Sequence, residues 1–304
     1  MISYHNPIIE NNLTISIDNV VLDVWVANPA TRDMIENRLF SMAKKDVALI
    51  TWEGNKRGTF RKQYLVKKEN STSFWIGHGL IGTSIMAERY RLEFNPNKVG
   101  SDPHFVAIHE LLVHNCRKPM SRIARFDLAI DIPVERTKCF LVKDRRLYIE
   151  RRHGVEYTQY LGAKSSSVGR VKLYNKSAEA KLDYSLTRLE LTLDPAKVYE
   201  DINFPTVYYM NTVSITDDEV KVTETERFIL NALLQGFGTI NDLGRKTRAK
   251  IETLFKYYVQ PITISAETYA CALAQLDTYL TGSGDMENKE QEKNGGKNND
   301  ELRY

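Results

Sequence analysis

The sequence predicts an α+β fold, in which an antiparallel, sheet-rich domain with packed helices precedes a small helical module of the winged-helix or helix-turn-helix type. Most segments between residues 13 and 200 are short, rich in β-branched and aromatic residues, and often alternate between apolar and polar positions. Two stretches with helical periodicity interrupt them, as expected of helices that pack on a sheet. After about Phe204 the pattern becomes helical.

The first hundred residues are expected to be mainly strands, separated by turn sequences. The predicted strands are Leu13–Val26 and the segments 47–54, 61–69, 71–79 and 88–96. The helical stretches are Thr31–Lys45 and Pro103–Cys116, in which apolar residues recur at intervals of three and four.

Three later segments, Ala124–Ile132, Gly169–Lys176 and Thr187–Leu193, alternate apolar residues with charged ones. Each would turn one apolar face to a core and one charged face away from it. If the three are neighbours in one sheet, acids, bases and a phenol share a surface. The polar positions are Arg125, Asp127, Asp131, Arg170, Lys172, Tyr174, Lys176, Arg188 and Glu190.

Such a surface has the residue types for phosphate chemistry. Carboxylates are the natural ligands of Mg²⁺ or Mn²⁺, and a nearby phenol can attack a phosphodiester once cations neutralise the growing charge. At roughly 3.3 Å per residue, Asp127 and Asp131 lie about 13 Å apart along a strand and cannot bind one ion together without a bend. We therefore expect Asp127 and Glu190 to hold the metal, with Asp131 as a supporting partner.

Charge is unevenly distributed behind a formal net value of +3. Between Arg136 and Lys181, twelve Lys and Arg stand against four acids, a local charge of +8. Basic surface at that density suits a phosphate backbone. The alternative explanation is the solvated face of an ordinary protein.

The sequence pattern of the C-terminal part predicts three helices. Thr223 or Thr225 would cap a helix that ends near Leu234, Thr239–Tyr258 resumes helical spacing, and Ile264–Gly282 begins with Ser265 as N-cap. Ile251, Leu254 and Phe255 would face inward. In a helix-turn-helix, the second helix lies in the major groove of DNA. The alternative explanation for this segment is a basic helix within a small helical bundle. The candidate DNA contacts are Lys172, Arg188, Arg245, Lys246, Arg248 and Lys250.

Composition excludes several classes of protein. No apolar run approaches the ~20 residues that span a bilayer, which excludes an integral membrane protein. The first residues lack the features of a secretion signal. Three distant cysteines without a CxxC spacing argue against a disulfide scaffold or zinc module and fit the cytoplasm. No GxxxxGK[ST] motif is present, so we expect no helicase motor in this chain.

Three segments, RFDLAIDI, YLGAKSSSVGRVKLYNKSAE and TRLELTL, resemble in order and spacing the core motifs of the replication initiation factors of Gram-positive rolling-circle plasmids. Related relaxases of integrative elements share this pattern. The family has an R-x-D strand, a Y-x-G-x-x-x-S hairpin that leads into R-x-x-x-Y-x-K-x-x-E, and an R-x-E strand. The resemblance covers roughly residues 90–195, where YRLEFNPNK fits an upstream strand and turn. The His-hydrophobic-His motif of better-known nicking initiators is absent.

The resemblance implies that Tyr174 attacks one DNA strand at an origin and keeps the 5′-phosphate. Arg170 and Lys176 would contact phosphate, and Asp127 and Glu190 would hold Mg²⁺ or Mn²⁺. The implied partners are origin DNA, both double- and single-stranded, a host helicase and a second copy of the chain in a homodimer.

The implied domains are a nicking and replication-initiation domain over residues 1–212, a helical DNA-recognition module over 213–282, and a disordered polar tail over 283–304.

Three other tyrosines are rival candidates for the nucleophile. They are Tyr148, Tyr157 and Tyr160, of which Tyr160 is the strongest.

Two other functions remain open at this point. The chain could be a non-enzymatic initiator that binds an origin and recruits host replication proteins. It could also be a metal-dependent hydrolytic or RNA-processing nuclease that uses the same acids without a covalent step. Covalent attachment to a 5′-phosphate separates the nicking initiator from both.

Overall fold

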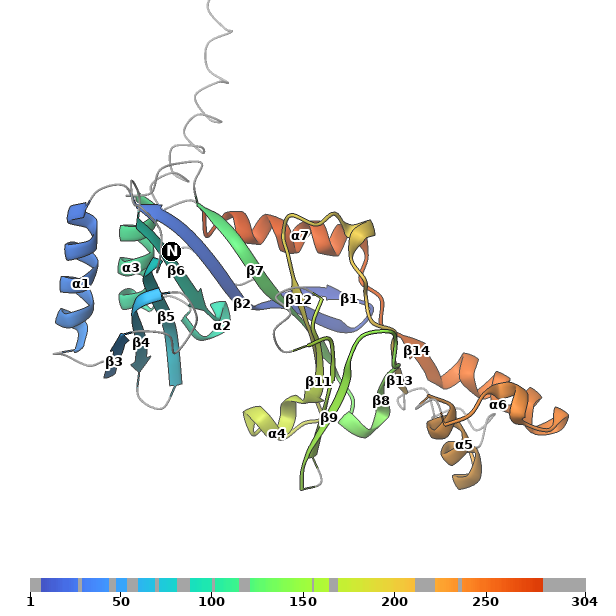
Figure 1. The fold of residues 1–304 in the computed structure, drawn as a ribbon. Helices are drawn as coiled ribbons and strands as arrows, with labels where there is room; N and C mark the ends of the chain where they lie inside the picture. Colours follow the sequence, from blue (N-terminus) through green and yellow to red (C-terminus); the bar gives the residue numbers. More distant parts are fainter. Residues whose placement is uncertain are drawn as a thin grey trace, which may run out of the picture. The chain divides into compact units, whose positions relative to one another are not determined.

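The computed structural model in Figure 1 describes residues 7–26, 29–43, 48–53, 60–68, 71–80, 88–99, 102–114, 121–154, 156–163, 169–210, 222–234 and 237–280. Antiparallel strands dominate it, and the described residues also form seven α-helices. The predicted α+β fold class is therefore confirmed. None of the helices described is long and apolar enough to cross a membrane.

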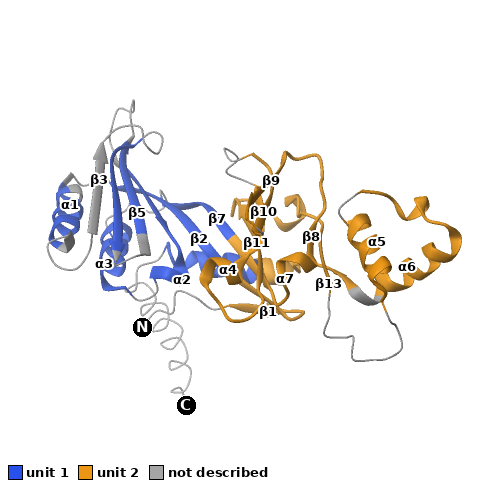
Figure 2. Ribbon diagram, turned by 90° about the horizontal axis from the view of Figure 1, so that it is seen from below, with its two compact units in different colours: residues 1–6, 17–127, 270–304 blue, residues 7–16, 128–269 orange. Residues whose placement is uncertain are grey.

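The chain forms two compact units, which Figure 2 shows in blue and orange. Unit 1 takes residues 1–6, 17–127 and 270–304, and unit 2 takes residues 7–16 and 128–269. Each unit is thus made of segments that are far apart in the sequence. The predicted boundary at 212/213 and the predicted tail at 283–304 lie outside the described residues, so the predicted domains stay predictions.

Unit 1 is built on a sheet whose strands follow the order β3-β4-β5-β6-β2-β7. Every strand predicted in the first hundred residues is present, with ends that differ by two residues at most. The bounds are β2 Leu13–Val26, β3 Ala48–Glu53, β4 Phe60–Lys68, β5 Ser71–Leu80, β6 Glu88–Phe94 and β7 Arg122–Ile132, of which β7 continues into unit 2.

Helices complete the core of unit 1. The predicted helices correspond to α1 (Pro29–Ala43) and α3 (Pro103–His114), and a short α2 (Pro96–Val99) precedes α3. The ring of Phe105 lies 4.6 Å from that of Phe94, which in turn lies 5.2 Å from Tyr279, in the residues after α7 (Ala266–Asp277). His109 is buried and its Nε2 lies 2.8 Å from the Tyr279 carbonyl oxygen. Tyr279 therefore belongs to this core.

A buried carboxylate group lies among the strands of unit 1. The Asp23 side chain has no exposed surface, and Arg91 donates to its two oxygens at 2.8 and 2.9 Å while Arg89 donates as well. Burial alone would raise the pKa of Asp23, but the hydrogen bonds and charges of Arg91 and Arg89 outweigh it and lower the pKa.

Unit 2 contains the strand order β7-β12-β11-β10-β9, with β1 paired to β2. The bounds are β1 Ile8–Glu10, β9 Tyr148–His153, β10 Glu156–Leu161, β11 Val171–Asn175 and β12 Thr187–Leu193. A second sheet joins β14 (Val259–Pro261), β13 (Val207–Met210) and β8 (Cys139–Leu141). The apolar face predicted for β11 and β12 is buried at Leu173, Leu189 and Leu191, but Tyr174 and Arg188 of the opposite face are buried as well.

The helices of unit 2 follow the predicted spacing. Glu226 N–H donates to Thr223 Oγ1 at 3.3 Å, which makes Thr223 the cap of α5 (Glu224–Leu234). A 3₁₀ turn at Ile240–Asp242 precedes α6 (Arg245–Tyr258). Ile251 and Leu254 are buried against Leu230 of α5, and Phe255 packs against this cluster as predicted.

Candidate functional site

The sheet of unit 2 brings several of the predicted site residues to one face. Lys172 of β11 pairs with Glu190 of β12, and Tyr174 pairs with Arg188. On the other side of β11, Lys172 pairs with Tyr160 of β10. Because directly opposed residues of neighbouring strands project to the same face, all five side chains share one surface. We call this surface the tyrosine face.

Tyr174 lies at the centre of this face and is 5% exposed. Its hydroxyl donates to Glu190 Oε1 at 2.6 Å and lies 3.2 Å from Glu179 Oε2. A phenol has one proton, so the shorter contact, to Glu190, is the main hydrogen bond. Burial raises the pKa of Tyr174 well above its ordinary value, and the Glu190 and Glu179 carboxylates raise it further.

A lysine lies beside each of the two carboxylates, Glu190 and Glu179. Lys172 Nζ lies 3.2 Å from Glu190 Oε2 and 3.6 Å from the centre of the Tyr174 ring. Lys176 Nζ lies 2.5 Å from Glu179 Oε2. Burial would raise the pKa of Glu179, but the hydrogen bond and charge of Lys176 outweigh it and lower the pKa. The phenol therefore lies between two carboxylates that are each held by a lysine.

The local sequence explains this arrangement. Asn175 ends β11 and caps α4 (Lys176–Ala180), because Ala178 N–H donates to its Oδ1 at 3.1 Å. The helix begins directly after the strand, which brings Glu179 back over Tyr174. No role was predicted for Glu179, although its place in the Y-x-K-x-x-E spacing was a visible signal.

Asp131 and Arg188 form a separate pair. Arg188 donates from Nε and Nη2 to the two Asp131 oxygens at 2.6 and 2.7 Å, and the side chains are 9% and 15% exposed. Both oxygens of Asp131 therefore already accept from a cation. Arg188, predicted to contact DNA, is bonded within the sheet.

The predicted metal ligands are Asp127 and Glu190, with Asp131 as a supporting partner. Asp131 is bonded to Arg188. In the part of the chain that the structure describes, no three His, Cys, Asp or Glu residues are grouped so that they could hold a metal ion. Metal binding by Asp127 and Glu190 stays a prediction.

The rival tyrosines divide between the two faces of the sheet. Tyr160 is on the tyrosine face, where Arg170 and Arg151 lie 4.9 and 5.8 Å from its ring centre. Tyr157 alternates with Tyr160 along β10 and faces the other side. Tyr148 also faces that side, where its hydroxyl donates to Glu150 at 2.9 Å and burial raises its pKa to about 12.

The four basic residues near the start of α6 differ in their surroundings. Arg245 and Lys246 are exposed at the start of the helix. Arg248 donates to the carbonyl oxygens of Asn241 and Leu243 at 2.9 and 3.3 Å. Lys250 Nζ lies 2.5 Å from Glu226 Oε1 on α5. Two of the four thus hold the helical module together.

Comparison with solved structures gives a distant likeness. No family model matches the chain, and no curated protein matches it. Among solved structures, the chain is similar to a rolling circle replication initiator protein from Geobacillus stearothermophilus, with a TM-score of 0.36 and 13% identity over 84% of this chain and 88% of that chain. A likeness this distant assigns neither a family nor a function to the chain.

Proposed function

We propose that the chain is a plasmid or mobile-element replication initiator that nicks one strand of origin DNA and forms a covalent tyrosyl-DNA intermediate through Tyr174. The observation that supports it is the 2.6 Å hydrogen bond from the Tyr174 hydroxyl to Glu190 on a face that also carries Lys172. A phenol, a carboxylate that accepts its hydrogen bond and a cation in one network are the groups that the proposed phosphoryl transfer would use.

The proposed step balances as follows. The Tyr174 oxygen bonds to the phosphorus of a phosphodiester, and its proton passes to Glu190. The bond from phosphorus to the 3′-oxygen breaks, and that oxygen leaves as a hydroxyl after it takes a proton from water. The phosphotyrosine bond keeps the strand end attached, so a later 3′-hydroxyl can rejoin it by the reverse step.

The raised pKa of Tyr174 decides how this step proceeds. Free tyrosinate is scarce near neutral pH, so loss of the proton must accompany the attack on phosphorus, which is general-base catalysis. Lys172 and Lys176 are held by Glu190 and Glu179, and an incoming phosphate would compete with those carboxylates for both lysines. Arg170, near the Tyr160 ring, is the third cation for the phosphate.

The remaining parts of this proposal rest on the sequence. They are the dependence on Mg²⁺ or Mn²⁺, origin reading by Arg245 and Lys246, cooperation with a host helicase, and dimerisation.

The test incubates the protein with Mn²⁺ or Mg²⁺ and supercoiled plasmid carrying the origin, and then probes for relaxed circles with attached protein. Tyr174→Phe should remove the adduct and keep DNA affinity within about twofold, because the ring still fills its site. Tyr160→Phe is the matched control, since it removes a hydroxyl from the same face and should keep the adduct. An adduct that survives in Tyr174→Phe and disappears in Tyr160→Phe would assign the nucleophile to Tyr160.

A non-enzymatic origin-binding initiator is the second candidate function. The observation that favours it is the burial of Tyr174, whose 5% exposure is typical of a structural side chain. If the chain has this second function, the wild-type protein binds the origin duplex and gives no adduct with Mn²⁺ or Mg²⁺. The same experiment therefore separates the two functions.

A further inference from the structure

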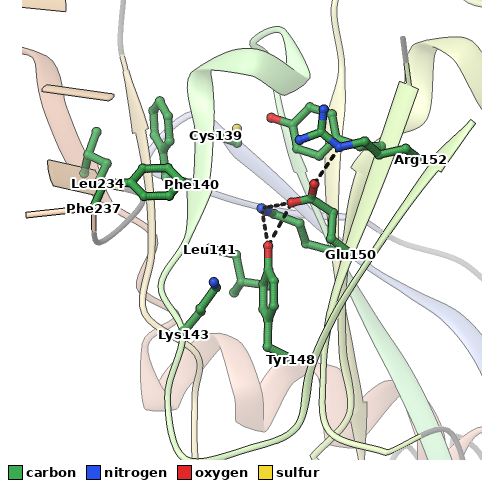
Figure 3. A pocket seen from close by; sticks show the side chains of 11 residues that line it. Cys139, Phe140, Leu141, Lys143, Tyr148, Glu150, Arg152, Leu234 and Phe237 are labelled. Carbon is green, nitrogen blue, oxygen red and sulfur yellow. Dashed lines mark hydrogen bonds and ion pairs between the residues drawn. The ribbon is translucent and has the colours of Figure 1, made fainter. Parts of the chain in front are cut away.

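A cavity of about 420 Å³ lies on the other face of the same sheet (Figure 3). Residues from β8, β9 and β10 line it, together with Leu234 and Phe237 at the end of α5. Its β10 residues, Tyr157 and Gln159, alternate with Tyr160, and Gln159 pairs with the buried Leu173 rather than with Lys172. The cavity therefore faces away from Tyr174 and is not part of the candidate nicking site. Its size falls within the usual range for small-molecule sites.

One side of the cavity is a fixed polar group centred on Glu150. Tyr148, Arg152 and Gln159 donate to its carboxylate at 2.9, 2.8 and 3.2 Å. Arg136, which is 4% exposed, fixes Gln159 by donating to its Oε1 at 2.6 Å. Burial would raise the pKa of Glu150, but these hydrogen bonds and the charge of Arg152 outweigh it and lower the pKa. An acceptor is thus held in place before any ligand arrives.

The other side of the cavity is aromatic and apolar. Figure 3 shows Phe140, Leu234 and Phe237 across the cavity from Tyr148 and Glu150. Phe237 is 79% exposed, so its ring is accessible to a ligand. Such a surface suits a flat ring.

Two exposed cations complete the lining. Lys143 is exposed and its Nζ lies 4.6 Å from the Tyr148 ring centre, and the Arg152 side chain is 76% exposed. A flat aromatic group with an attached anion would meet both the apolar side and these cations. Nucleotides have this combination of a ring that stacks and a phosphate that binds cations.

We propose that this cavity binds one unpaired nucleotide of single-stranded DNA, with the base against Phe140 and Phe237 and the phosphate near Lys143 and Arg152. The choice of DNA as the source of the nucleotide rests on the proposed function. Glu150 can accept from an exocyclic amino group, as acidic side chains do from cytosine. The cavity should therefore prefer cytosine or adenine over thymine, which lacks such a group.

The experiment uses the full chain with Tyr174→Phe, so that no cleavage interferes. Calorimetry measures binding of dCMP, dTMP and inorganic phosphate. A short single strand carrying one 2-aminopurine reports stacking, because its fluorescence falls when the base stacks on a ring. Phe237→Ala tests the aromatic side. Phe228→Ala is the matched control, because Phe228 is a 73% exposed phenylalanine of α5 that does not line the cavity.

We expect dCMP to bind more tightly than dTMP, and both more tightly than phosphate. Phe237→Ala should weaken dCMP binding and strand quenching by about fivefold or more, the usual effect of removing one stacking ring, and Phe228→Ala should change neither. Equal losses in the two variants, or phosphate binding as tight as that of dCMP, would overturn the nucleotide site. Binding of dCMP without quenching of the strand would overturn DNA as its source.

Failure of this proposal is distinguishable from failure of the proposed function. A wild-type protein that forms the tyrosyl-DNA adduct but binds no nucleotide here overturns the cavity alone. A protein that gives no adduct, yet loses strand quenching only with Phe237→Ala, refutes nicking and supports the cavity.

Discussion

Glu190 has two opposing effects on the proton of the neighbouring Tyr174 hydroxyl. Its carboxylate accepts a hydrogen bond from the Tyr174 hydroxyl at 2.6 Å and also helps to raise the pKa of that phenol. The two effects oppose each other: the charge keeps the proton on the phenol oxygen in the absence of substrate, whereas in the proposed step the same carboxylate receives the proton during attack. A substitution that removes only the charge of Glu190 distinguishes the two effects.

Glu190→Gln should lower the pKa of Tyr174 toward its ordinary value and yet slow adduct formation by about 100-fold or more, because the proton acceptor is lost. Tyrosinate absorbance, followed against pH as the difference between this variant and the same variant with Tyr174→Phe, measures the pKa. A faster nicking rate in Glu190→Gln would mean that deprotonated Tyr174, and not transfer to Glu190, limits the reaction.

Asp23 gives a prediction about pH and stability. Its pKa is lowered in the folded protein, so its contribution to stability is present above the unfolded pKa of about 3.9 and is lost as the pH falls through the folded pKa. Asp23→Asn should therefore destabilise the protein most near neutral pH, and the difference from wild type should shrink below about pH 4. Urea unfolding at a series of pH values measures this difference, and a difference independent of pH would contradict the assignment.

At the scale of elements, we expect the exposed basic residues of α6 to read DNA, whereas Arg248 and Lys250 are bonded within the helical module. Arg245→Ala should leave the melting temperature unchanged and lower the preference for origin over scrambled duplex by about 1–3 kcal/mol, as for a side chain that contacts a base edge. Arg248→Ala should lower the melting temperature, because two carbonyl oxygens lose their donor. Competition binding at fixed salt and thermal melts test both. The reverse pattern would assign DNA reading to Arg248.

Strands in which apolar and polar residues visibly alternate could be predicted from the sequence, whereas strands too short to show such alternation could not. β2 matches its predicted bounds, and alternation in β11 and β12 placed Tyr174 and Glu190 on one face. The strands β8, β13 and β14 have three or four residues each, too few for a period to be visible. Their pairing joins distant segments, such as Phe140 with Tyr208, which only tertiary structure reveals.

Side-chain partners within the site were the least predictable part. Charged positions on β7 and β12 were identified correctly, but nothing local shows that Asp131 is bonded to Arg188 rather than to a metal. Both roles need an acid on a polar strand face. The choice depends on which side chain lies opposite in the folded sheet.

At the scale of the whole molecule, the two units predict the effect of truncation. A fragment that ends at Thr212 lacks Tyr279, which is 1% exposed in unit 1, and Tyr269, which donates to the Lys197 carbonyl at 3.1 Å in unit 2. Loss of a buried aromatic side chain costs about 3–5 kcal/mol, so the fragment should melt about 10 °C or more below the full chain. A chain that ends at Gly282 is the control, since it keeps both residues. Equal melting of both fragments would support the predicted boundary at 212/213.

The discontinuous units also set an order of events during synthesis. Asp127 of unit 1 leaves the ribosome about 140 residues before Ala270, which opens the last segment of that unit, and translation of this interval takes on the order of ten seconds. During this time Phe94 and Phe105 have no Tyr279 to pack against. A nascent chain therefore exposes an incomplete aromatic core until its late residues arrive.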